Sequence, residues 1–403
     1  MVLNQEKTQS PFVSNFLANM ENKEQALKDF LNDIRLRGTP IIEICPNNQV
    51  FKLVTFIWIG DSATTNVHVF GSFPGWDISN SRLTNIKGTE IWYKTYRTNE
   101  TFVSTYRFSI NDQFKEDWVK RSKNYQNDPF NKNTFLYVKN SVDPESKDSL
   151  TSILELGMTL DNNDTQTQDY SKGNLEIHDF TSAILNNERR IWIYTPSNYL
   201  DKETPCKLLI SYDGRPTMTT LKAPTILDKL IHNKEIPPVV MIGINSVNRF
   251  QELTFNHDFI KFLSNELVPW VRNKYNVSKD PKDNIISGFS LGGLASFFAA
   301  FNHPEIFGNV LSLSGSVHWK KEGYEGEIPW MLQSFKDNKT LPIKVFMEAG
   351  ILENKPLLDS NKNLHKILKS KGYDVQYNEF LGGHDDIWWQ NELPQGLKYL
   401  LNN

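Results

Sequence analysis

The sequence predicts an α/β protein in which a β-sandwich precedes a mostly parallel sheet that is covered by helices on both faces. A chain of 403 residues is too long for a single compact core, so two domains are expected. Short β-branched and aromatic runs dominate the first part of the chain, whereas apolar strands alternate with amphipathic helices in the rest. A serine flanked by glycines also stands between a strand-like and a helix-like segment.

The N-terminal region combines a helical arm with strands at sandwich-like spacing. Apolar residues recur at helical spacing from Leu27 to Ile34, in a segment rich in Lys and Glu that ends near Gly38. Turn residues then separate short runs of β-branched and aromatic residues. These runs cover residues 54–58, 67–70, 91–93 and 103–108. Residues 1–140 are therefore predicted to form a β-sandwich with an N-terminal helical arm.

The stretch that follows predicts a connection between two domains. Within residues 141–175, the part from Asp161 to Gly173 is polar, acidic and nearly free of apolar side chains. The apolar run Ile153–Leu156 just before it could still pair with a sheet. We therefore expect residues 141–175 to be a linker or a surface loop.

Residues 176–403 have the pattern of one α/β domain. Strand-like apolar runs alternate with helical patterns, such as the one that places Phe259, Leu263 and Trp270 on one helical face. Continuous apolar strands of this kind are typical of parallel sheets that are buried on both faces. The runs are residues 190–196, 207–214, 238–244, 310–315, 343–347 and 375–379, together with the short strand before Ser290.

Composition and charge argue against several classes of protein. Hydrophobic residues make up 39% of the chain, and a formal net charge of −3 provides no basic field for nucleic acid or an anionic membrane. No apolar run approaches the length of a membrane span, and no apolar signal core follows Met1. Cys45 and Cys206 provide neither metal-ligand spacing nor a disulfide framework. We expect a cytoplasmic protein that binds neither nucleic acid nor membrane.

The turn around Ser290 carries the clearest chemical signal. Its Gly-x-Ser-x-Gly pattern, between a short apolar strand and a helix, is that of the nucleophile elbow of α/β-hydrolases. Gly288 and Gly292 omit side chains where the strand and the helix pass closely. The N–H of Leu291, at the start of the helix, is expected to stabilise an oxyanion. The alternative is a glycine-rich turn without chemistry.

A serine nucleophile needs a base, and in the α/β-hydrolase fold the residues of the triad follow in the order Ser, acid, His. His384 follows the last predicted strand on a Gly-Gly turn and is the expected base. Glu353, on the loop beyond the strand at residues 343–347, is the expected acid that stabilises the imidazolium. Glu348 lies nearer the end of that strand and is the second candidate.

Three more residues belong to the expected site. The backbone N–H of Arg215, in the turn after the third strand of the sheet, is the expected second oxyanion donor. A Gly-Arg turn can also be a plain connection between a strand and a helix. His318 and Trp319 follow the end of a strand and are expected to line the substrate pocket, although plain packing would explain His318 equally well.

Several stretches match a single family of hydrolases. In the C-terminal half these are Arg190–Pro196, Tyr212–Gly214, Arg249–Leu253, Gly288–Gly293, Ser314–Ser316, Glu348–Glu353 and Gly382–Asp385. In the N-terminal half they are Gly38–Pro40, Val54–Trp58, Gly88–Trp92 and Asp128–Pro129. Over nearly its whole length the chain resembles the enterochelin (ferric-enterobactin) esterase family, a relative of the esterase-D-type α/β-hydrolases. The R-x-x-E-L motif and the two-domain layout are more specific than the elbow.

This resemblance implies hydrolysis of the ester bonds of a cyclic tri-catecholate siderophore after its iron complex is imported. Ser290, Glu353 and His384 match the family's triad positions. Arg249 lies in the matched R-x-x-E-L motif, where a cation suits an anionic catecholate complex. A salt bridge from Arg249 to Glu252 is the alternative. Family members often carry an aromatic residue just after the Asp-Gly turn, and this chain does not, so the particular siderophore is open.

The sequence contains no visible cluster of metal ligands, so no cofactor and no protein-bound metal are expected, and iron would enter with the substrate. The resemblance implies that the sandwich narrows the pocket, but Phe73, Trp76 and Trp92 are expected to be sandwich core. One alternative function is a general carboxylesterase or acyl-thioester hydrolase with an accessory sandwich. The other is a non-enzymatic protein that binds glycans or a partner.

Overall fold

The computed structural model divides the chain into two compact units. It describes residues 10–402, apart from residues 76, 117, 123, 140–146, 158–170, 198 and 200–203. The N-terminal unit comprises residues 1–161 together with the short segment 381–385, and the C-terminal unit comprises residues 162–380 and 386–403. Among the described residues, no helix is long and apolar enough to span a membrane.

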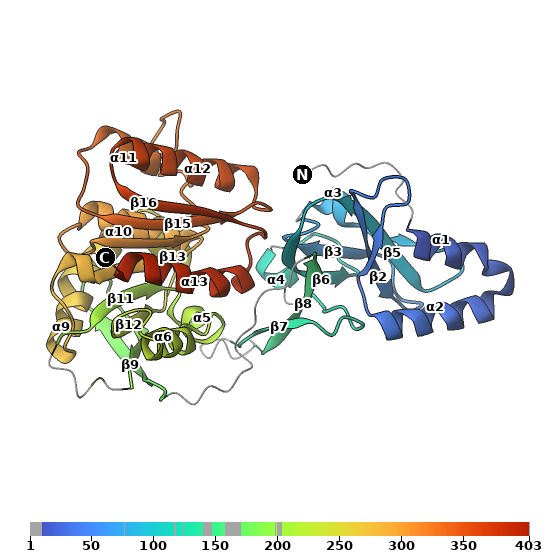
Figure 1. The fold of residues 1–403 in the computed structure, drawn as a ribbon, viewed down its shortest axis with the longest axis horizontal. Helices are drawn as coiled ribbons and strands as arrows, with labels where there is room; N and C mark the ends of the chain where they lie inside the picture. The colour runs from blue at the N-terminus through green and yellow to red at the C-terminus, as the bar shows by residue number, and fades with distance from the viewer. Residues whose placement is uncertain are drawn as a thin grey trace. The chain divides into compact units, whose positions relative to one another are not determined.

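The N-terminal unit contains two antiparallel four-stranded sheets (Figure 1), which confirms the predicted sandwich. Its strands are β1 (Ile41–Ile44), β2 (Lys52–Ile59), β3 (Val67–Gly71), β4 (Thr84–Asn85), β5 (Ile91–Thr98), β6 (Phe102–Ile110), β7 (Thr134–Tyr137) and β8 (Ser149–Leu156). One sheet has the order β1-β2-β5-β4 and the other β3-β6-β8-β7. Strand β8 lies beyond the predicted boundary at residue 140, because its backbone pairs with β6 and β7.

Aromatic side chains fill the core of this sandwich. Phe56 on β2 meets Tyr106 on β6 edge to face, with ring centroids 4.8 Å apart. Phe73 lies against Phe56 and is completely buried, and Trp92 is also buried, in agreement with their prediction as core residues. Trp76, which was predicted with them, lies outside the described residues.

The helical arm packs on the sheet that contains β1 and β2. Its helices are α1 (Pro11–Ala18) and α2 (Lys23–Arg37), joined by a 3-10 turn at Met20–Asn22. Phe12 and Phe16 of α1 contact Phe30 of α2, with ring centroids 4.9 and 4.7 Å apart. These rings share one buried cluster with Ile41 of β1 and Ile57 of β2. Two further short helices are α3 (Ile78–Ser81) and α4 (Trp118–Ser122).

The C-terminal unit is built on one eight-stranded, mostly parallel sheet, as predicted. Its strands are β9 (Asn174–Ser182), β10 (Asn187–Thr195), β11 (Lys207–Tyr212), β12 (Val239–Ile244), β13 (Asn284–Phe289), β14 (Asn309–Leu313), β15 (Lys344–Gly350) and β16 (Asp374–Phe380). Their order is β16-β15-β14-β13-β11-β12-β10-β9. The strands from β16 to β12 are parallel, whereas β10 runs antiparallel to both of its neighbours.

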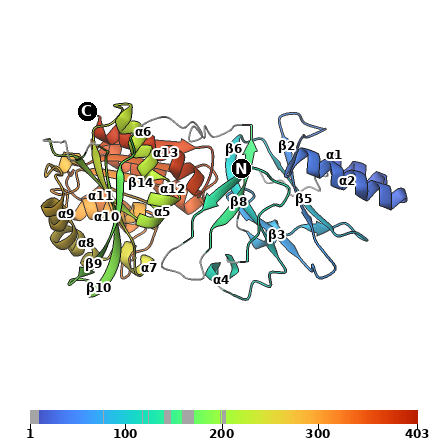
Figure 2. The ribbon, with the colours of Figure 1, turned by 90° about the horizontal axis from the view of Figure 1, so that it is seen from below.

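Helices cover both faces of this sheet. They are α5 (Gly214–Thr219), α6 (Ala223–His232), α7 (Arg249–Leu253), α8 (His257–Phe262), α9 (Val268–Lys274), α10 (Leu291–Asn302), α11 (Trp330–Asp337), α12 (Lys355–Ser370) and α13 (Asp386–Leu401). One buried cluster includes side chains of α8 to α12, and a separate cluster includes α5, α6 and α13. Figure 2 shows α8 and α9 on one side of β9 and β10, with α5 and α6 on the other. The carboxyl ends of the parallel strands therefore form one edge at which loops can meet.

Candidate active site

Ser290 occupies the sharp turn between β13 and α10. Its backbone has a φ of 56° and a ψ of −120°, a strained conformation that non-glycine residues rarely adopt. A Cβ atom at Gly288 would lie 2.6 Å from the backbone of Gly292, so only glycine fits where the strand passes the helix. The turn therefore has the strand–turn–helix geometry that a nucleophile elbow requires.

The loop after β14 lies directly against this turn. The Ser316 N–H donates to the Ser290 carbonyl at 2.9 Å, and the two hydroxyl oxygens are 3.4 Å apart. The Ser290 N–H donates to the Leu313 carbonyl at 2.9 Å. Leu291 begins α10, and N–H groups in the first turn of a helix have no acceptor within that helix. The elbow thus places a hydroxyl beside N–H groups that can receive negative charge.

Arg249 is anchored beside the elbow by an ion pair that the sequence did not indicate. Its Nε and Nη2 atoms each lie 2.7 Å from an oxygen of Asp213, and Nη2 is 3.4 Å from the carbonyl of Phe289. The alternative salt bridge to Glu252 is wrong, because Glu252 instead accepts two hydrogen bonds from Arg189, each at 3.0 Å. Arg249 and Glu252 of the R-x-x-E-L motif therefore belong to two separate ion pairs. The pair between Arg249 and Asp213 is the one that lies beside the elbow.

The turn that carries Arg215 is fixed by a side chain from elsewhere in the sheet. The N–H of Arg215 donates to Oδ1 of Asn245 at 2.9 Å, so this predicted oxyanion donor is already engaged. Asp213, which precedes the turn, has a φ of 51° in the left-handed region. Asn245 follows β12 and lies 30 residues further along the chain, which explains why the sequence gave no sign of this bond. A substrate oxygen would have to compete with Asn245 for the donor.

The two candidate acids occupy very different environments. Glu348 lies at the end of β15 and is fully buried beside the carboxyl group of Glu392. Burial, reinforced by the charges of Glu392 and Glu353, raises the pKa of the Glu348 carboxyl well above its usual value. Glu353 lies in the turn after β15, where its N–H donates to the Gly350 carbonyl at 3.1 Å. Since a neutral carboxyl cannot stabilise an imidazolium, these environments favour Glu353.

His384 lies in the segment 381–385, which belongs to the N-terminal unit. Within that unit the Val103 N–H donates to the first carbonyl of the segment at 3.1 Å. The N–H of Thr105 donates to the Asp385 carboxylate at 3.3 Å, and the Thr105 hydroxyl donates to the same carboxylate. Strand β6 therefore holds the segment at both ends. Sequence patterns could not reveal these bonds, because their partners lie about 280 residues apart.

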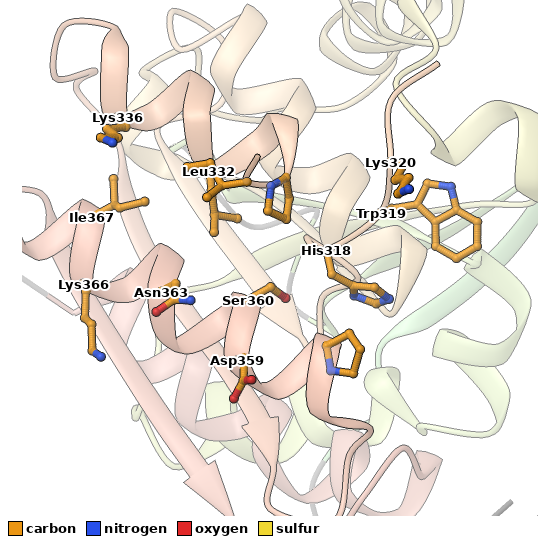
Figure 3. A pocket seen from close by; sticks show the side chains of 13 residues that line it. His318, Trp319, Lys320, Leu332, Lys336, Asp359, Ser360, Asn363, Lys366 and Ile367 are labelled. Carbon is orange, nitrogen blue, oxygen red and sulfur yellow. The ribbon is translucent and has the colours of Figure 1, made fainter. Parts of the chain in front are cut away.

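His318 and Trp319 line a cavity of about 860 Å³ beside α11 and α12 (Figure 3). We term this cavity the α11–α12 groove. Its other lining residues are Lys320, Ile328, Pro329, Leu332, Lys336, Pro356, Asp359, Ser360, Asn363, Lys366 and Ile367. The Trp319 ring also meets Phe250 of α7 edge to face, with centroids 5.3 Å apart. The structure thus brings both predicted pocket residues to one cavity in the C-terminal unit.

The described residues contain no group of three or more His, Cys, Asp or Glu side chains that could hold a metal ion. Cys45 and Cys206 are both buried and form no disulfide. The reactive groups around the elbow are therefore a serine hydroxyl in a strained turn, N–H groups at a helix start and an ion-paired arginine. Such a set suits nucleophilic attack on an ester carbonyl.

Comparison with known proteins points to the same chemistry. A family model described as "Putative esterase" matches residues 182–400. The chain is 25% identical to the iron(III) enterobactin esterase of Dickeya dadantii, over 97% of this chain and 96% of that protein. It is also 31% identical over 221 residues to an iron(III) enterobactin esterase of Escherichia coli, an alignment that spans 54% of each chain.

Solved structures extend the similarity to both units. The crystal structure of an enterobactin esterase from Shigella flexneri, determined in the presence of enterobactin, is 26% identical to this chain. The match has a TM-score of 0.71 and covers 90% of this chain and 96% of that one. A ferric enterobactin esterase from Salmonella typhimurium shares the fold with a TM-score of 0.73. The similarity therefore includes the sandwich as well as the sheet that carries the elbow.

Proposed function

This chain belongs to the family described as "Putative esterase", and we propose that it hydrolyses the ester bonds of a catecholate siderophore, as the free ligand or as its ferric complex. The observation that carries this proposal is the strained Ser290 turn, which lies within the matched residues 182–400. The iron belongs to the substrate and is not a resident cofactor. Hydrolysis in the cytoplasm would release it from the ligand.

Each residue of the proposed triad has a defined task. The Ser290 hydroxyl oxygen attacks the ester carbonyl, while His384 takes the hydroxyl proton and returns it to the departing alkoxide. The resulting acyl-enzyme is then cleaved by water, with His384 again acting as the base. Glu353 stabilises the imidazolium that forms in both steps. The N–H of Leu291 stabilises the oxyanion, and the N–H of Arg215 would join it when released from Asn245.

The substrate class is supported by similarity over the whole chain and by charge beside the elbow. The Dickeya relative, which is named for iron(III) enterobactin, aligns with 97% of this chain. Arg249 places a guanidinium next to the residue that precedes the nucleophile, and its side chain is 38% exposed. Although Asp213 offsets its charge, this partly exposed guanidinium can still donate hydrogen bonds to the anionic oxygens of a catecholate complex.

Replacement of the nucleophile tests the proposed chemistry. Ser290→Ala is expected to lower kcat by about 10⁴-fold or more, because the members of a triad act as a unit. The melting temperature should remain close to that of the parent protein, because alanine keeps the Cβ atom and leaves the strained backbone of the turn unchanged. Hydrolysis of a chromogenic acyl ester by the purified variant provides the measurement. Turnover close to that of the parent would rule out the elbow as the catalytic site.

Product analysis tests the proposed substrate. The purified protein is incubated with iron-free and ferric catecholate triesters and with a simple acyl ester, and the products are followed by mass. We expect stepwise cleavage to linear trimer, dimer and monomer, because each cleavage leaves a smaller ester that can bind again. Rapid hydrolysis of the acyl ester with no cleavage of any triester would instead support a general carboxylesterase.

A further inference from the structure

Helix α13 packs closely on β15, the strand that leads to the turn with Glu353. A Cβ atom on Gly396 of α13 would lie 2.9 Å from the Phe346 side chain of β15, so the helix and the strand touch. The buried residues of α13 are uncharged apart from Glu392, and those of β15 are uncharged apart from Glu348. Two carboxyl groups therefore meet inside an otherwise apolar contact.

Glu348 and Glu392 form a hydrogen-bonded carboxyl pair. Within the described parts of the chain, the Glu392 carboxyl is the one group that hydrogen-bonds to the two buried oxygens of Glu348. Two carboxylates cannot hydrogen-bond to each other, so one of the pair carries a proton. Glu392 is 8% exposed and accepts a hydrogen bond from Asn391 at 3.1 Å, which favours its charged form, whereas Glu348 is completely buried. The proton therefore belongs to Glu348, which donates to Glu392.

The start of α13 also contacts the two strands beside the elbow. The Trp389 ring stacks on Phe289, the residue before Ser290, with ring centroids 4.5 Å apart and an angle of 14° between the rings. Its Nε1 atom donates to the Ser314 hydroxyl at 3.0 Å. The N–H of Ser314 in turn donates to the Glu348 carbonyl at 3.1 Å. The carboxyl pair thus belongs to one packed group with the residue that precedes the nucleophile.

The pair joins the helix that follows the proposed base to the strand that precedes the proposed acid. Helix α13 begins at Asp386, just after His384 in the chain, and β15 ends at Gly350, just before Glu353. A shift of α13 along β15 would therefore displace the base relative to the acid. Catalytic rates are sensitive to such shifts, and a misplacement of about 1 Å can cost about 10²-fold.

The surroundings of Glu348 favour its protonated form. The titratable groups that face it are Glu392 from α13, Glu353 from the turn after β15 and Tyr377 from β16. Burial, followed by the charges of Glu392 and Glu353, raises the pKa of the Glu348 carboxyl well above its usual value. The proton is retained below this raised pKa and is lost as pH rises through it. Two carboxylates then share one buried place and repel each other.

We propose that Glu348 and Glu392 are positioning residues, which hold the start of α13 on β15 through one shared proton and so keep His384 and Glu353 aligned. The inference rests on the proposed ester hydrolysis by Ser290. Neither carboxyl touches the substrate or exchanges a proton with it. When the shared proton is lost, the two carboxylates repel and the alignment of the triad is lost. The pair thus sets an alkaline limit to the activity.

The alkaline side of the pH–rate profile tests the pair. We measure kcat for a chromogenic acyl ester and expect it to fall about tenfold at alkaline pH in the parent, with KM changed little. Ionisation of His384 explains a fall on the acidic side only, because the neutral imidazole is the base. Glu348→Gln should keep its kcat at alkaline pH, since the amide donates to Glu392 at every pH. The same alkaline fall in the parent and in Glu348→Gln would overturn the proposal.

Substitutions of Glu392 separate the hydrogen bond from the packing. Glu392→Leu leaves the Glu348 carboxyl without a partner and should lower kcat at neutral pH by about tenfold, with KM changed little. Glu392→Gln keeps an oxygen that accepts the proton of Glu348 and should retain kcat. Glu379→Gln is the control, because Glu379 is exposed on β16 and is paired with Lys362 at 3.1 Å. Equal losses in the two Glu392 variants, or a matching loss in the control, would contradict the positioning role.

A fluorophosphonate distinguishes failure of the pair from failure of the proposed function. Its phosphorus bonds to the Ser290 oxygen, fluoride leaves and His384 takes the hydroxyl proton, so the labelling rate reports the alignment of the triad without an ester. Ester hydrolysis together with labelling that has the same pH dependence in the parent and in Glu348→Gln would remove the pair and leave the esterase. Labelling that falls at alkaline pH in the parent alone, in a protein that cleaves no catecholate ester, would retain the pair and remove the siderophore substrate.

Discussion

At the scale of single residues, the environment of a carboxyl group decides what it can do. Glu348 and Glu353 are five positions apart and both are buried, yet complete burial beside Glu392 raises the pKa of the Glu348 carboxyl well above its usual value, whereas Glu353 lies in the turn after β15. The same principle applies to Arg249, whose guanidinium is held by Asp213 and so points to a fixed place beside the elbow. A charged side chain that is already fixed loses less conformational entropy when a substrate binds than a mobile side chain would lose.

The same substitution at each position shows which of Glu348 and Glu353 is the acid of the triad. Glu353→Gln is expected to lower kcat for an acyl ester by about 10³- to 10⁴-fold, because a neutral amide cannot stabilise the imidazolium. Glu348→Gln should lower kcat by less than about tenfold, because the amide replaces a carboxyl that is already uncharged. Steady-state kinetics on both purified variants make the comparison. The reverse order would place the acid at the end of β15.

The raised pKa of Glu348 has a consequence for stability. Above its usual value of 4.5 the unfolded chain releases the proton that the folded protein keeps, so the free energy of unfolding falls as pH rises toward the folded-state pKa. Glu348→Gln removes this dependence. The variant should gain stability relative to the parent as pH rises from 4.5 toward the folded-state pKa, by up to about 1.4 kcal/mol per pH unit. Urea unfolding of the parent and the variant at pH 5 and pH 8 measures the free energy of unfolding. If the difference between the two proteins is the same at both pH values, Glu348 is ionised in the folded protein.

At the scale of elements, each candidate residue is positioned by a short segment between regular structures. Ser290 depends on the approach of β13 to α10, and Glu353 on the turn between β15 and α12. The segment that carries His384 instead depends on strand β6, through its hydrogen bonds to Thr105. The position of His384 is therefore expected to depend on β6 as well as on its own segment.

Thr105→Val tests this positioning role, because valine keeps the volume of threonine and removes the hydroxyl donor to Asp385. We expect kcat for a small acyl ester to fall about tenfold, since a modest displacement of a catalytic group is costly, while KM changes little. Thr151→Val is the control, because Thr151 is a buried threonine of the same sheet whose hydroxyl donates to the Tyr106 carbonyl. An unchanged kcat in Thr105→Val, or an equal loss in the control, would contradict the role.

At the scale of the whole molecule, each of the two units has buried cores of its own. The rings around Phe56 form the core of the sandwich, and Phe297 on α10 belongs to the largest cluster of the C-terminal unit. Each core excludes water by itself, so each unit can unfold as its own cooperative transition. This organisation also explains why sequence patterns change character along the chain.

Matched core substitutions test this organisation by scanning calorimetry. Phe56→Ala and Phe297→Ala each remove a completely buried ring and should cost about 3–5 kcal/mol. We expect two transitions in the parent protein, of which Phe56→Ala lowers one and Phe297→Ala lowers the other. A single transition that both variants lower by the same amount would show that the units unfold together.

Sequence patterns predicted the features that depend on neighbours along the chain. Strand and helix periods predicted the sandwich and the parallel sheet, because alternation and helical spacing reflect local burial. The spacing of Gly288, Ser290 and Gly292 predicted the elbow, because the close approach of β13 to α10 is made within a few residues. The Ser, acid, His order named both candidate acids, but the pattern could not show which one burial would neutralise.

Features that join distant parts of the chain became visible in the folded structure and could not be predicted from the sequence. The partner of Arg249 is Asp213 and not the nearer Glu252, and the N–H of Arg215 finds Asn245. The α11–α12 groove likewise exists only because a loop and two helices that are separate in sequence come together. Hydrogen bonds and ion pairs act over a few ångströms in space, and only the packing of the sheet and its helices sets those distances.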